Sequence, residues 1–120
     1  MMAVTDDALA QLLAVPRVVY GYLRPEASDA LEIAAWHKDI AHFCGEAGYQ
    51  LAGVFTDRGV PHDCVKRAGL SGLLDVLALP ETYGLVVPSI EHLSRDDTTL
   101  KILGLLISNT KAHIIVMDRA

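Results

Sequence analysis

Short runs of β-branched and aromatic residues alternate with amphipathic helical stretches, and that alternation restricts the fold of this chain more than any other feature. Four such runs predict strands: Arg17 to Leu23, Gln50 to Thr56, Tyr83 to Val87 and His113 to Met117. The third run is apolar throughout, which is typical of a strand buried on both faces. Strands separated by helices predict an α/β fold: a three-layer sandwich with a mostly parallel sheet of four or more strands.

The first helix between these strands is expected over about Ser28 to Ala47. Ser28 is a suitable N-cap, and Gly48 follows the last helical residue. Seven residues at helical spacing predict the buried face: Ile33, Trp36, His37, Ile40, Phe43, Cys44 and Ala47.

Further helices are expected over Leu70 to Leu79 and after Ser94, which is taken as the cap that precedes Asp96 and Asp97. An extra short helix is expected within residues 1–15. With 120 residues and no linker-like stretch, the chain is interpreted as a single domain, 1–120. Hydrophobic residues make up 52 % of the chain and charged residues 21 %, which suits a packed core.

Composition also limits the partners and the compartment. The longest apolar run is too short to cross a membrane, and the two cysteines have no paired spacing. We therefore expect a cytoplasmic protein with reduced thiols. The formal net charge of −5 has the wrong sign for a protein that binds duplex DNA over much of its surface, because the DNA backbone is negatively charged. A protein partner or self-association is expected, with DNA contacted only weakly or through that partner.

Charged and polar residues follow each predicted strand, and in open parallel sheets ligands bind at that edge. They are Arg24 and Glu26; Asp57 and Arg58; Ser89, Glu91, His92 and Arg95; and Asp118 and Arg119. Three kinds of site that are common in such folds do not fit this sequence. The turn after the first strand lacks the glycines of a dinucleotide site, the third strand lacks a receiver's acceptor aspartate, and no P-loop is present.

A fourth candidate does fit. Tyr20-Gly21-Tyr22-Leu23-Arg24 resembles the opening strand of the resolvase/invertase (serine recombinase) catalytic domain, and Phe55-Thr56-Asp57 is similar to the end of that family's second strand. Arg67-Ala68-Gly69-Leu70 resembles its Arg-x-Gly-Leu helix start. The stretch from Ile90 to Asp96 resembles its Leu-Asp-Arg-Leu-Gly-Arg-Asp signature. The four motifs occur in the family's order.

The resemblance implies a site that stabilises the charge growing on a DNA phosphate while a serine attacks it. Arginine suits this because its planar fork meets two phosphate oxygens. By motif, Arg24, Arg67 and Arg95 match the family's arginines and are the candidates for binding phosphate or another anion.

Several departures argue against catalysis. Glu26 occupies the position of the nucleophilic serine, Glu91 replaces the signature aspartate, and His92 replaces the arginine beside it. Ser28 is the only nearby hydroxyl and is better explained as a helix cap. The family's long dimerisation helix and helix-turn-helix domain do not follow in this sequence. We further expect Glu26 to pair with at least one of the three arginines, with Glu91 as a second candidate.

Histidines and cysteines do not suggest a metal site. His37 and Cys44 share the predicted buried stripe, and His62-Asp63-Cys64 lies in a loop, but no CxxC or HxxxH pair occurs. No metal and no cofactor is expected. His42 and His113 are interpreted as surface or strand histidines, Trp36 and Phe43 as core, and Arg58 and Arg119 as solvated loop ends.

Three hypotheses of function follow. The favoured one is a catalytically degenerate relative of the serine recombinases, a non-cleaving interaction or regulatory module. The second is an enzyme that still transfers DNA strands through Ser28 or a partner's residues. The third is a flavodoxin-like domain that binds a small ligand or phosphate.

Overall fold

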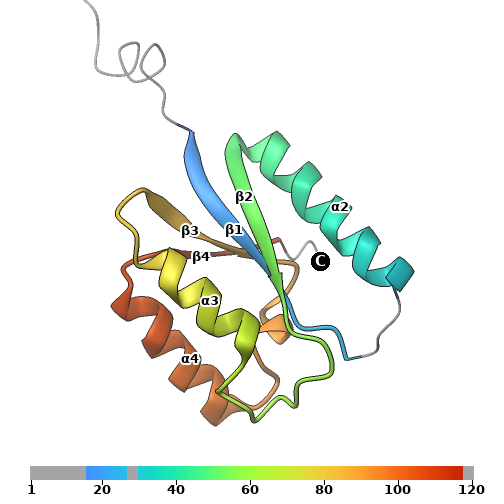
Figure 1. Cartoon of the computed structure of the whole chain (residues 1–120), viewed down its shortest axis with the longest axis vertical. Coiled ribbons are helices and arrows are strands. Elements are labelled where there is room, and N and C mark those ends of the chain that lie inside the picture. Colours follow the sequence, from blue (N-terminus) through green and yellow to red (C-terminus); the bar gives the residue numbers. More distant parts are fainter. Residues whose placement is uncertain (1–15, 27–29, 118–120) are drawn as a thin grey trace, which may run out of the picture.

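The computed structural model describes residues 16–26 and 30–117 and contains four strands, three α-helices and one 3₁₀ turn (Figure 1). Their order is β1 (Arg17–Leu23), α2 (Ala30–Ala47), β2 (Tyr49–Thr56), α3 (Ala68–Leu77), β3 (Thr82–Val87), η1 (Ile90–His92), α4 (Asp97–Asn109) and β4 (His113–Val116). The predicted helix within residues 1–15 lies outside the described residues, as do Ser28, Asp118 and Arg119.

All four strands are parallel, in the order β2-β1-β3-β4. The strand order reverses direction between β1 and β3, and such a switch point opens a crevice at the carboxyl ends of the strands. β3 is buried from Gly84 to Val87, as its apolar sequence predicts. The predicted α/β class with a mostly parallel sheet is confirmed.

Helices cover both faces of the sheet, with α2 on one side and α3 and α4 together on the other (Figure 1). The α2 side is packed by Val19, Leu23, Ile40, Cys44 and Val86. The larger core on the other side is built from Tyr22, Leu70, Leu73, Leu77, Leu85, Val87, Leu93, Leu103 and Ile107. Among the described helices, none is long and apolar enough to span a membrane.

Two details of the helices differ from the sequence prediction. His37 and Ala47 are exposed on α2 and do not belong to its buried stripe, where Ile33, Ile40 and Cys44 are buried. Asp96, not Ser94, caps α4, because its carboxylate accepts the Thr99 N–H at 2.9 Å and the Thr99 hydroxyl at 2.7 Å. These bonds lower the pKa of Asp96.

Gly84 allows β3 and β4 to approach one another. A Cβ at this position would collide with the backbone carbonyl of His113, the residue that pairs with Gly84 across the two strands. Any side chain here would therefore force the edge strand away from the sheet.

Candidate functional site

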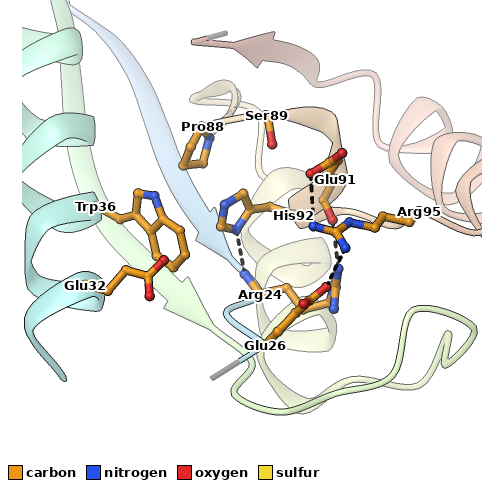
Figure 2. A pocket seen from close by; sticks show the side chains of 9 residues that line it. All are labelled: Arg24, Glu26, Glu32, Trp36, Pro88, Ser89, Glu91, His92 and Arg95. Carbon is orange, nitrogen blue, oxygen red and sulfur yellow. Dashed lines mark hydrogen bonds and ion pairs between the residues drawn. The ribbon is translucent and has the colours of Figure 1, made fainter. Parts of the chain in front are cut away.

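The loops after β1 and β3 meet at the carboxyl edge of the sheet, and together with the start of α2 they line a pocket of about 500 Å³ (Figure 2). The pocket lies where the strand order reverses. It is lined by Arg24, Glu26, Glu32, Trp36, Pro88, Ser89, Glu91, His92 and Arg95. Six of these nine residues are charged or polar residues that follow a strand in the sequence, as predicted for this edge.

Arg24 is a buried cation that no carboxylate of the described residues pairs with. Its Nη1 donates to the Val60 carbonyl at 3.1 Å, and its Nη2 donates to the Glu91 carbonyl at 2.9 Å and contacts the His62 ring. The side chain is 4 % exposed, and its Nε has no acceptor within residues 16–26 and 30–117. Burial, and secondarily the nearby Arg67 charge, lower the pKa of Arg24.

Arg95 carries the ion pairs of the pocket. Its Nη1 lies 3.1 Å from Glu26 Oε1, and its Nη2 lies 3.3 Å from Glu91 Oε2. The predicted pairing of Glu26 with an arginine is confirmed, and so is that of Glu91. All three side chains are more than half exposed, so the Coulomb attraction is weakened by solvent. A hydrogen bond from His62, followed by the Arg95 charge, lowers the pKa of Glu26.

His62, in the loop after β2, contacts three charged residues of the site: Arg24, Glu26 and Arg95. Its Nδ1 contacts Arg24 Nη2 and the Arg95 backbone N–H, which can only donate, so the ring proton sits on Nε2 and is donated to Glu26 at 2.8 Å. Its carbonyl accepts from Arg67 Nη2 and from the Ser94 hydroxyl. No functional role could be predicted for His62 from the sequence, because nothing near it in the chain indicates how the loop folds back.

Arg67 does not line the pocket. It is 3 % exposed and bonds to the carbonyls of Cys64 and His62 and to the Tyr22 hydroxyl. Of the three arginines matched by motif, the structure therefore brings Arg24 and Arg95 to the pocket and places Arg67 behind it.

Behind the pocket, Asp57 fixes the start of α3. Its carboxylate accepts the Gly69 N–H at 2.6 Å, the Leu70 N–H at 2.9 Å and the Tyr22 hydroxyl at 2.8 Å. Two of these donors are free N–H groups in the first turn of the helix, which favours an anion. Burial raises the pKa of Tyr22 well above its ordinary value. A Cβ at Gly69 would lie 2.9 Å from the Asp57 carboxylate, so glycine lets the cap approach.

His92 forms the floor of the pocket as an uncharged ring. Its Nδ1 accepts the Arg24 backbone N–H at 3.0 Å, and its ring meets Trp36 edge to face with centroids 4.8 Å apart (Figure 2). Burial, reinforced by the Arg24 charge, lowers the pKa of His92 to about 4. The ring is therefore neutral near pH 7, with its proton on Nε2.

The remaining histidines and cysteines lie apart from this pocket. His42 is exposed on α2, 3.1 Å from Glu46, while Cys44 is buried against the sheet. In the part of the chain that the structure describes, no three His, Cys, Asp or Glu side chains are grouped as a metal site would require.

No protein-family profile and no curated protein matches the sequence. Solved structures do match the fold. The N-terminal catalytic domain of TP901-1 integrase superposes with a TM-score of 0.73 at 19 % identity, over 84 % of this chain and 78 % of that one. The C-terminal catalytic domain of ISC1926 TnpA, an IS607-like serine recombinase, gives 0.74 at 17 %, over 85 % and 68 %. A resolvase family site-specific recombinase from Streptococcus pneumoniae gives 0.67 at 14 %, over 84 % and 72 %.

The chain has the fold of a serine recombinase catalytic domain. Within that fold the aromatic-Gly-Tyr-x-Arg motif forms the end of β1, and the motif that begins at Ile90 forms η1 and the start of α4. Both motifs deliver an arginine to the pocket, Arg24 from the first and Arg95 from the second. Glu26, at the position that the resemblance gives to the serine, lies in the same pocket.

Proposed function

We propose that this chain is a serine-recombinase-like domain that does not cleave DNA and that acts as an interaction or regulatory module with a protein partner or a second copy of itself. The observation that carries the proposal is the Glu26 carboxylate, held 3.1 Å from Arg95 and 2.8 Å from His62. The protein's own carboxylate, at the nucleophile position, thus takes the place of the external anion that the arginines would otherwise favour.

Charge supports the same conclusion. A phosphate that approaches Arg95 meets the carboxylates of Glu26 and Glu91, which already occupy its guanidinium. Arg24 is committed to two backbone carbonyls and to His62, and Arg67 to carbonyls and a hydroxyl. With a formal net charge of −5, the chain can neutralise few phosphates, so we expect only weak and salt-sensitive binding to duplex DNA.

The first test is cleavage. The protein is incubated with supercoiled and with nicked DNA, and the products are separated under denaturing conditions. We expect no strand to become linked to protein, because the serine nucleophile is replaced and the remaining groups of such a unit do little alone. A phosphoserine-linked strand would contradict the proposal and would favour a strand-transfer activity through Ser28, which lies outside the described residues.

The second test is the filled anion site. Glu26→Ser and Glu26→Gln should each bind inorganic phosphate roughly tenfold more tightly than the unmodified protein, because the competing carboxylate is gone. The glutamine variant keeps the bulk of the side chain and so separates charge from space. Glu81→Gln, an exposed change before β3, is the matched control. Equal phosphate affinity in all four proteins, measured by calorimetry, would show that the Glu26 carboxylate does not compete with phosphate for the arginines.

A further inference from the structure

The pocket between α2 and the 88–92 loop extends beyond the ion pairs of Arg95, and three polar groups in this part have no partner among the described residues. The Glu32 carboxylate and the Ser89 hydroxyl line it without a hydrogen bond to any described residue, and His92 Nε2 also lacks an acceptor within the described ranges. A volume of about 500 Å³ falls within the range typical of small-molecule sites.

The groups without partners lie on two walls of the pocket, and these walls touch where the Trp36 and His92 rings meet with centroids 4.8 Å apart. Glu32 and Trp36 stand one turn apart on α2, whereas Pro88, Ser89 and His92 come from the loop opposite (Figure 2). One wall thus offers an indole ring and a carboxylate acceptor, and the other offers a proline ring, a hydroxyl and a neutral imidazole N–H. The flat walls favour a planar ligand, because aromatic rings stack well on indole.

Charge selects among planar ligands. Three carboxylates and two guanidiniums line the pocket, so the balance of charge disfavours a free anion. Among the described residues, Arg95 pairs with two carboxylates and Arg24 donates to carbonyls, although Arg24 Nε has no acceptor there. No described group donates to the exposed Glu32 carboxylate, which can therefore accept a hydrogen bond from a ligand. The ligand should therefore be uncharged, planar and able to donate toward Glu32 while accepting from the His92 N–H or the Ser89 hydroxyl.

We propose that this pocket binds a nucleobase with an exocyclic amine, stacked on Trp36 and donating that amine to Glu32. Adenine and cytosine present an amine next to a ring nitrogen acceptor, and carboxylates accept well from such amines. The inference rests on the proposed function in one respect: Glu26 and Glu91 keep Arg95 occupied, so the ligand needs no phosphate.

Trp36 is the only tryptophan of the chain, so its emission reports on this pocket alone. The unmodified protein is titrated with cytidine, uridine, adenosine and inosine, each up to about 10 mM, the range of weak small-molecule binding. Calorimetry is a second readout that light absorption by the bases cannot disturb. Uridine and inosine are matched ligands, because each carries a carbonyl where cytidine or adenosine carries the amine.

We expect cytidine and adenosine to bind saturably and at least roughly tenfold more tightly than uridine and inosine, as a charge-assisted hydrogen bond implies. Glu32→Gln should reduce that preference to about twofold or less, and Glu81→Gln should retain it. No saturable binding by either readout, equal binding of cytidine and uridine, or an unchanged preference in Glu32→Gln would each overturn the inference.

Two further titrations separate the possible failures. Inorganic phosphate that binds the unmodified protein as tightly as it binds Glu26→Gln would contradict the proposed function, whatever the nucleosides do. Arginine amide that binds more tightly than cytidine would identify a site for a cationic side chain and would overturn the nucleobase inference alone.

Discussion

Acidification from pH 7 to pH 5 should destabilise the fold through one imidazole, that of His92. The residue is 8 % exposed, and its Nδ1 accepts the Arg24 backbone N–H. Its pKa is about 4 in the folded protein, against an ordinary value of 6.5. Because the unfolded chain holds this proton more tightly, the stabilisation is complete above about pH 6.5 and is lost as the pH falls toward 4.

The size of the effect follows from that difference in pKa. The full shift corresponds to about 3 kcal/mol of unfolding free energy, of which about 2 kcal/mol falls between pH 7 and pH 5. The stabilisation therefore falls by more than half within a range that leaves most carboxylates ionised.

Urea unfolding followed by Trp36 emission at pH 7, 6 and 5 measures this loss. His92→Gln keeps an oxygen that can accept the Arg24 N–H but cannot gain a proton. This variant should be less stable than the unmodified protein at pH 7, yet it should lose about 2 kcal/mol less on acidification. His42→Gln should keep the original pH dependence. A His92→Gln protein with the same pH dependence as the unmodified chain would refute the reasoning.

Two further substitutions test the frame of the site. Asp57→Asn should lower the unfolding free energy by about 1–3 kcal/mol, because the amide cannot accept all three hydrogen bonds that the carboxylate now accepts. Asp63→Asn, in the same loop, is the control and should change the unfolding free energy by no more than about 0.5 kcal/mol. Equal effects of the two substitutions in urea unfolding would contradict the capping role of Asp57. Gly84→Ala should lower the unfolding free energy by about 2 kcal/mol or more, because the alanine Cβ would collide with the His113 carbonyl. The same substitution should increase hydrogen exchange in β4, and unchanged exchange there would contradict the close approach of the two strands.

The fold could be predicted from the sequence because its elements are marked locally. The strand from Arg17 to Leu23 matches the structure at both ends, since β-branched and aromatic residues make up most of it and Pro16 precedes it. The start of α3 was predicted two residues late, because its cap is Asp57, eleven residues before the helix. A cap so far along the chain leaves no local signal.

The site was only partly predictable for a similar reason. Arg24 and Arg95 belong to motifs at strand ends, so their convergence follows from the parallel sheet. Arg67 belongs to an equally good motif, but its side chain turns inward to Tyr22, and motif spacing does not encode that direction. His62 gains its role only when the loop after β2 packs over the site, which depends on contacts distant in sequence.

The strand order β2-β1-β3-β4 also has a consequence during synthesis on the ribosome. β1 is made first but lies between β2 and β3, so one of its edges stays open after β2 has emerged. That edge can close only when Val87 has left the exit tunnel, roughly 2–6 s later at ordinary rates of translation. Throughout that interval the nascent chain presents the unpaired, apolar edge of β1, which is the kind of surface that chaperones bind and that neighbouring nascent chains can pair with.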